Sequence, residues 1–125
     1  MEKERWIVDG MNVIGSRPDG WWRDRPGAMR DLAEQLGGWA AGRDVTVVFD
    51  GRPVEAPADG IRVEFASRGG RNAADDDIVR LVEADSDPKG LRVVTSDREL
   101  SRRVRELGAE VVSARAFRHE LEPDS

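Results

Sequence analysis

The sequence has no cysteine, no tyrosine and a single histidine among its 125 residues. The absence of cysteine excludes disulfides, thiolate zinc sites and a cysteine nucleophile. Because His119 is the single histidine, a paired-histidine metal site is excluded and a Ser/His/Asp triad has little basis. We expect His119 to lie on the surface. Carboxylates are therefore the main candidates for chemistry.

Long hydrophobic runs are also missing. No apolar segment approaches the roughly 18–20 residues of a membrane span, and the charged start of the chain is not followed by an apolar leader. We therefore expect a soluble, cytoplasmic protein with no membrane partner. The length predicts one domain over residues 1–125, with its core at about residues 5–117.

Positive charge is scarce overall and is carried almost entirely by arginine. The net charge is −5, which argues against nucleic-acid binding through bulk positive charge. Only Lys3 and Lys89 are lysines among the 20 basic residues. Because a guanidinium can bind a phosphate through two hydrogen bonds, a local arginine patch for RNA remains open.

Apolar runs and turn residues predict strands alternating with helices. Strands are expected at residues 6–8, 45–49, 61–65, 91–95 and 110–112, and helices at 28–40, 73–82, 97–107 and 114–121. Residues 11–27 show no sustained period and read as a long loop. The short link before residues 61–65 leaves the direction of that strand open. The pattern predicts a doubly wound, three-layer α/β domain with a mostly parallel central sheet of about five strands.

Two helix starts have candidate caps. Asn72 can cap the helix that follows it, and Ser96 to Glu99 matches a capping box. Gly108 is expected to end the helix that begins there.

Aspartates follow three of the predicted strands. Asp9 and Asp50 come directly after strand residues, and Asp97 follows its strand after one intervening residue. Two more aspartates, Asp75 and Asp76, begin a predicted helix. In a parallel sheet these positions share the carboxyl edge, where ligands bind. Turn formation or helix capping is the alternative explanation for each of them, and for Asp97 in particular.

Several carboxylates on one edge repel each other unless a cation neutralises them. Oxygen ligands without histidine or cysteine favour Mg²⁺ or Mn²⁺ over zinc or copper. Such an ion can generate a hydroxide and stabilise the charge of a phosphoryl group, so phosphodiester hydrolysis is the reaction that fits.

Four motifs, in order, carry a resemblance to a known family. Residues 9–15, Asp-Gly-Met-Asn-Val-Ile-Gly, resemble the opening motif of NYN-domain proteins of the PIN-like nuclease superfamily, especially their YacP-like bacterial branch. Residues 48–51, 74–78 and 94–98 resemble the later motifs of that branch at similar spacing. Ala73 is a departure, because the branch tends to have threonine there.

The resemblance implies a PIN-like fold and a metal-dependent endoribonuclease that cuts single-stranded RNA. Carried over by position, the catalytic residues would be Asp9, Asn12, Asp75, Asp76 and Asp97. The metal ligands would be Asp9, Asp75, Asp76 and Asp97, with Asp50 as a supporting or ligating acid. Asn12 and Ser96 would position water, metal or phosphate.

Arginines near the same edge are candidates for holding the RNA backbone. Arg68, Arg71 and Arg98, together with Arg52 and Arg102, could contact phosphates, or could belong to a solvated charged surface. Trp21 and Trp22 could stack on unpaired bases, although we expect at least one of them to pack over the sheet. The expected partner is mRNA, rRNA or tRNA, with the ribosome as a candidate, and the protein is expected to be a monomer or homodimer.

Two other functions remain alternatives. One is a non-catalytic RNA-binding or ribosome-binding module that keeps the fold. The other is an aspartyl-phosphate fold, which needs a lysine near a later strand end. Lys3 and Lys89 lie elsewhere in the predicted order, which disfavours this alternative.

Overall fold

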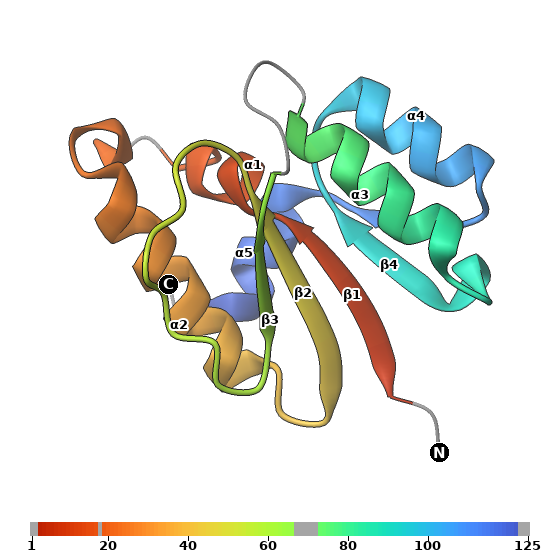
Figure 1. Ribbon diagram of the computed structural model, residues 1–125, viewed down its shortest axis with the longest axis horizontal. Coiled ribbons are helices and arrows are strands. Elements are labelled where there is room, and N and C mark those ends of the chain that lie inside the picture. Colours follow the sequence, from red (N-terminus) through yellow and green to blue (C-terminus); the bar gives the residue numbers. More distant parts are fainter. Residues whose placement is uncertain (1–2, 18, 67–72, 123–125) are drawn as a thin grey trace.

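The computed structural model describes residues 3–17, 19–66 and 73–122 (Figure 1). Its centre is a five-stranded, fully parallel sheet in the order β3-β2-β1-β4-β5. The strands are β1 (Glu4–Asp9), β2 (Arg43–Phe49), β3 (Arg62–Phe65), β4 (Leu91–Val94) and β5 (Glu110–Val112). The helices are α1 (Gly10–Gly15), α2 (Arg25–Trp39), α3 (Ala73–Ala84), α4 (Arg98–Glu106) and α5 (Ala114–Leu121), with short 3-10 helices at Trp21–Arg23 and Pro88–Gly90. The predicted α/β class is confirmed.

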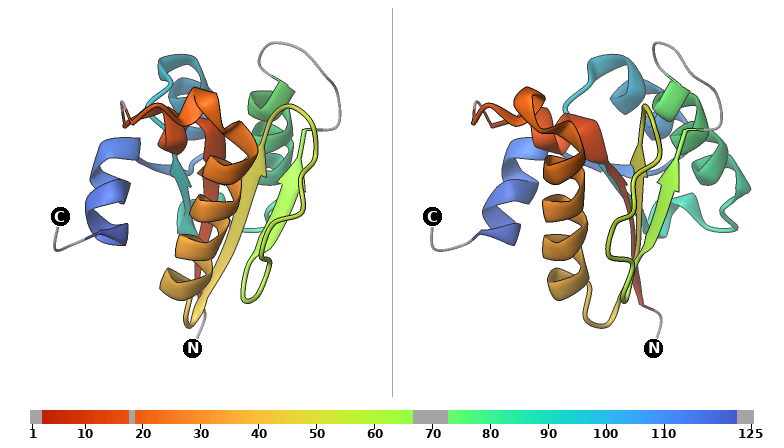
Figure 2. Two further views of the ribbon diagram at one scale, coloured as in Figure 1. Left: turned by 90° about the vertical axis from the view of Figure 1, so that its left-hand side faces the viewer. Right: turned by 60° about the vertical axis from the view of Figure 1, so that its left-hand side comes forward.

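The helices form a layer on each face of the sheet. Helices α1, α2 and α5 cover one face, and α3 and α4 cover the other (Figure 2). Side chains of β1 alternate between the two cores: Trp6 and Val8 belong to the α2 side, and Ile7 belongs to the α3 side. Burial on both faces explains why β1 and β2 read as continuous apolar runs. No helix in the described part of the chain is both long and apolar enough to cross a membrane.

The chain segment after β1 differs from the prediction. Residues 10–15 form helix α1, where a loop was expected. The helix has only six residues, too few for its period to emerge from the sequence. Gly10 is required at its start, because a Cβ atom there would lie 2.4 Å from the ring of Phe49. This close approach lets the chain turn directly from the end of β1 into α1.

The direction of β3 is now settled: it runs parallel to β2. The connection over residues 50–61 contains no helix. Instead, Val54 and Ala56 pack against the core on the α2 side. An irregular segment with its own apolar contacts thus takes the place of a crossover helix.

Helix α4 begins one residue later than the predicted capping box implied, at Arg98 instead of Asp97. Asp97 is the N-cap, and its Oδ1 accepts a hydrogen bond from the Leu100 N–H at 2.8 Å. The prediction that Ser96 caps this helix is therefore wrong. The Ser96 hydroxyl instead accepts a hydrogen bond from the Ala114 N–H at 2.9 Å, at the start of α5. Gly108 follows the helix with φ of 103°, as expected for its end. The predicted cap Asn72 lies outside the described residues.

The strand order locates the expected binding edge. The chain builds β1, β2 and β3 to one side, then crosses to β4 and β5 on the other side of β1. The order therefore reverses between β1 and β4. In sheets of this kind, ligands bind outside the carboxyl ends of the strands that flank such a reversal.

Candidate active site

Asp9 lies at the carboxyl end of β1, and its side chain is buried at 5% exposure. The Thr95 hydroxyl, which follows β4, donates a hydrogen bond to Asp9 Oδ2 at 2.9 Å. The same hydroxyl oxygen accepts a hydrogen bond from the Asp97 N–H at 3.1 Å. Thr95 therefore links the ends of the two central strands at the point where the strand order reverses.

The environment of Asp9 disfavours its negative charge. Burial, together with the neighbouring carboxylates of Asp75 and Asp50, raises the pKa of Asp9 to about 7. The hydrogen bonds from Thr95 and from the backbone of Asn12 act in the opposite direction. Asp9 is thus a buried acid whose charge is not compensated by a described cation.

Asp75 is the second acid with this property. It lies in the first turn of α3 and is partly buried. Burial and the charges of Asp97, Asp76 and Asp50 together raise its pKa to about 6, although Arg103 acts in the opposite direction. These couplings indicate that the five predicted acids share one electrostatic environment, because charges in water interact appreciably only at short range.

The other acids of the cluster each have a structural partner. Asp76 forms an ion pair with Arg103 of α4, with Oδ1 and Nη1 3.0 Å apart. Asp97 caps α4, which confirms the structural role considered for it. Asp50 forms an ion pair with Arg25 at the start of α2. The third aspartate of the run, Asp77, pairs with Arg80 on its own helix.

Asn12 and Ser96 connect helix α1 to the loop after β4. The Ser96 N–H donates a hydrogen bond to Asn12 Oδ1 at 2.7 Å. This contact fixes α1 to the connection between β4 and α4. Sequence reasoning placed both residues in the site, and the structure brings them together through this bond.

The predicted RNA-contacting side chains differ in what they contact. Arg98 is exposed at the start of α4 and forms no ion pair with another described residue, whereas Arg102 is paired with Glu99 and Glu106. Trp21 packs against the core as expected, and Trp22 is 58% exposed. Arg52 and His119 are exposed, and Arg68 and Arg71 lie outside the described residues.

The acids do not form a ready-made coordination shell. Within residues 3–17, 19–66 and 73–122, no three His, Cys, Asp or Glu side chains are grouped so that they could hold a metal ion. The donor chemistry nevertheless fits Mg²⁺ or Mn²⁺, since all candidate ligands are carboxylate oxygens. Mg²⁺ commonly uses only one or two carboxylates and completes its shell with water and substrate phosphates. Asp9 and Asp75, with their raised pKa values, are the two acids that a cation would relieve.

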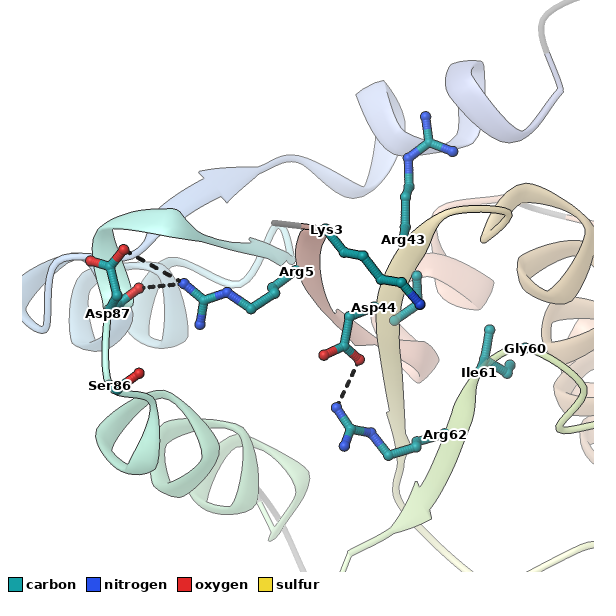
Figure 3. Close-up of a pocket in the computed structure, with 10 residues that line it drawn as sticks. Lys3, Arg5, Arg43, Asp44, Gly60, Ile61, Arg62, Ser86 and Asp87 are labelled. Carbon is teal, nitrogen blue, oxygen red and sulfur yellow. Dashed lines mark hydrogen bonds and ion pairs between the residues drawn. The ribbon is translucent and has the colours of Figure 1, made fainter. Parts of the chain in front are cut away.

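A pocket of about 650 Å³ lies at the opposite edge of the sheet (Figure 3). Its lining includes arginines from the starts of the strands, and these are engaged by acids: Arg62 pairs with Asp44 at 2.8 Å, and Arg5 pairs with Asp85 and Asp87. None of the five predicted acids lines it. This pocket is therefore separate from the candidate active site.

Comparison with known proteins agrees with the fold and the motifs. The family model of the YacP-like NYN domain matches residues 6–124. The chain belongs to this family. It is also similar to a mutant of Rae1 (YacP) from Bacillus subtilis, with 25% identity and a TM-score of 0.79, over 96% of this chain and 76% of that one. A second crystal structure of Rae1 (YacP) from the same organism gives 25% identity and a TM-score of 0.78, over 98% and 75% of the two chains.

No curated protein matches the sequence significantly. Membership of the YacP-like NYN family implies a nuclease-like function related to RNA, and RNA is the partner that it implies. The structural agreement with Rae1 (YacP) extends over nearly the whole chain. The resemblance identified from the four motifs is therefore confirmed.

Three side chains of this YacP-like NYN domain were not selected from the sequence. Thr95 bridges Asp9 and Asp97, and Arg103 and Arg25 neutralise Asp76 and Asp50. The signal for Thr95 was its place at a strand end beside two selected residues. The two arginines come from α4 and α2, so only the packed fold shows which acids they reach.

Proposed function

We propose that the protein is a metal-dependent endoribonuclease that hydrolyses phosphodiester bonds in single-stranded RNA at the carboxyl edge of its sheet. The observation that carries this proposal is the pair Asp9 and Asp75: their pKa values are raised to about 7 and about 6, and neither forms an ion pair with a described residue. A structural acid is normally paired or hydrogen-bonded to lower its pKa. An acid whose pKa is instead raised by its surroundings is typical of a catalytic or metal-binding position.

In this proposal, Asp9 and Asp75 would hold Mg²⁺ or Mn²⁺, with Asp97, Asp76 and Asp50 as supporting acids. The ion would supply a hydroxide and stabilise negative charge on the phosphoryl group. Thr95 orients Asp9 by donating to Oδ2, and its own orientation is fixed by the Asp97 N–H. The hydrogen bond between Ser96 and Asn12 fixes helix α1 relative to the loop after β4.

The paired acids have a different task in the same site. Arg103 and Arg25 compensate Asp76 and Asp50, which limits the repulsion that five carboxylates would otherwise create. Net negative charge is then concentrated on the buried Asp9 and the partly buried Asp75. This division supports a site in which two acids face the ion and the others set its surroundings.

A non-catalytic RNA-binding module is the second candidate. It is favoured by the finding that the described acids include no group of three arranged to hold a metal. In that case Asp9 and Asp75 would be remnants of a catalytic edge, and the protein would bind RNA without cutting it.

Cleavage of a labelled single-stranded RNA tests both candidates. Wild type, Asp9→Asn and Asp44→Asn are each incubated with Mg²⁺, Mn²⁺ or EDTA. Asp44→Asn is the matched control, because Asp44 lies at the opposite edge in an ion pair with Arg62. We expect metal-dependent cutting by wild type and Asp44→Asn, and a loss on the order of a thousandfold in Asp9→Asn, equivalent to several kcal/mol of metal-assisted stabilisation.

Thermal unfolding with and without 10 mM Mg²⁺ provides a second readout. The metal should raise the melting temperature of wild type but not that of Asp9→Asn, since a ligand stabilises only the state that binds it. RNA binding without cutting in any metal would favour the module instead. Equal cleavage by wild type and Asp9→Asn would contradict the assignment of Asp9.

A further inference from the structure

Helix α4 presents a row of arginines that leads away from the candidate active site. A pocket of about 500 Å³ is lined by Ser96, Arg98, Ser101, Arg102, Arg105 and Glu106. The α4 members are spaced three or four residues apart, so they share one face of the helix. Ser96 also lies at the carboxyl edge of the sheet, hydrogen-bonded to Asn12, so the pocket borders the candidate site at this residue.

Two of the arginines on this face are not neutralised. Arg98 and Arg105 are exposed, and neither forms an ion pair with another described residue. Arg102, between them, is bound by Glu99 and Glu106 at 2.5 and 2.7 Å. The outer two arginines therefore keep their hydrogen-bond donors available, while the middle one is fixed by the protein itself.

The contrast with the pocket at the opposite edge supports a ligand on the α4 face. There, the guanidinium groups of Arg5 and Arg62 are already bound by acids, and Figure 3 shows Arg62 directed at Asp44. Exposed arginines that form no ion pair within the described residues keep their guanidinium N–H donors available for an anion such as a phosphate. A chain of phosphates offers such anions at regular spacing.

We propose that the α4 face, from Ser96 to Arg105, binds the backbone of the RNA strand on one side of the cut. This inference rests on the proposed function. Arg98 contacts a phosphate next to the reacting one, and Arg105 contacts a phosphate further along the strand. The helix rise places the Cα atoms of Arg98 and Arg105 about 10 Å apart, which is more than the spacing between adjacent phosphates of one strand. The substrate is therefore an RNA chain with nucleotides beyond the cleavage point, and a dinucleotide is too short to use Arg105.

Binding is measured by fluorescence anisotropy in EDTA, so that no cleavage occurs. The probes are fluorescein-labelled single-stranded RNAs of 4 and 12 nucleotides, titrated at several KCl concentrations. The variants are Arg105→Gln, Arg105→Lys and Arg30→Gln. Arg30 is the matched control, because it is an exposed arginine on α2, across the sheet from α4.

We expect Arg105→Gln to weaken binding of the 12-mer about 5–10-fold, with a salt dependence reduced by about 0.7 in the logarithmic slope. Arg105→Lys should retain the slope, because the charge is kept. Binding of the 4-mer should change less than twofold, roughly the scatter of such measurements. Arg30→Gln should bind both RNAs like wild type.

Equal binding by Arg105→Gln and Arg30→Gln would overturn the inference. Arg105 would then serve only the negative end of the helix dipole, which would show as a lowered melting temperature without an effect on RNA. Parallel cleavage assays separate this failure from that of the proposed function. If Arg105→Gln cleaves and binds RNA like wild type, only the inference about the α4 face is contradicted. If wild type binds RNA but cleaves it in no metal, only the proposed nuclease function is contradicted.

Discussion

The two edges of the sheet handle buried or partly buried acids in opposite ways. At the edge where the strands begin, burial would raise the pKa of Asp85, but hydrogen bonds from Arg5 and from the Asp87 N–H outweigh it and lower the pKa. At the edge where the strands end, burial and the neighbouring acids together raise the pKa of Asp9 to about 7.

The difference teaches how to recognise a functional edge in a protein rich in acids. Aspartates occur at both edges, and position at a turn does not separate them. What distinguishes the aspartates of the two edges is whether a nearby cation or hydrogen-bond donor compensates their negative charge. An acid that is paired contributes to stability, whereas an unpaired buried acid costs stability and is kept for another reason.

The largest expected effect comes from Asp9→Asn in the metal-free protein. Asp9 is protonated in both states below pH 4, but between about 4 and 7 only the unfolded chain loses the proton. Wild-type stability should therefore fall relative to the variant as pH rises over this range, and the variant should be about 2–4 kcal/mol more stable at pH 8. Urea unfolding at pH 4, 6 and 8 measures this difference.

A constant difference between wild type and Asp9→Asn across these pH values would contradict the raised pKa. It would also remove the contrast between the two edges. Carrying out the same series in Mg²⁺ should reduce the difference at pH 8, because the cation would favour the ionised acid.

The second prediction applies the same chemical change to the opposite edge. Asp85→Asn should destabilise the protein by about 1–2 kcal/mol at pH 7, since it weakens a charged pair with Arg5 that is only partly exposed. The sign is the reverse of that for Asp9→Asn. Because the folded-state pKa of Asp85 is lowered, this loss should disappear as the pH falls below about 4, where the unfolded carboxyl is protonated.

RNA cleavage by Asp85→Asn should remain within about twofold of wild type, since the residue lies at the edge away from the site. A large loss of cleavage at a temperature where the variant is folded would show that the two edges are not independent.

The smallest expected effect comes from Thr95→Val. The change removes the donor to Asp9 and the acceptor for the Asp97 N–H, and should cost about 1 kcal/mol of stability. The pKa of Asp9 should rise above that of wild type, because the lost hydrogen bond favoured the ionised form. Carboxyl NMR titration of Asp9 checks the direction, and Thr95→Ser, which keeps the hydroxyl, should preserve the wild-type value.

The sequence itself was sufficient to predict the helix and sheet layers and the edge of the sheet where the candidate site lies. Alternating β-rich and helical segments predicted every strand, and aspartates after strand ends predicted the edge where Asp9, Asp75 and Asp97 meet. These signals are local, because hydrophobic periodicity and turn residues act over a few positions. The family motifs were readable for the same reason: each is a short segment at a strand end or helix start.

Only the tertiary structure decided how the charges are divided. Helix α1 and the parallel direction of β3 depend on contacts with Phe49 and with the α2-side core, which lie far away in the sequence. Likewise, Arg103 and Arg25 form ion pairs with Asp76 and Asp50 from other helices, whereas Asp9 and Asp75 form no ion pair with a described residue. Composition determined that carboxylates would carry the chemistry, but burial and long-range pairing selected which of them, because a pKa depends on everything packed around the group.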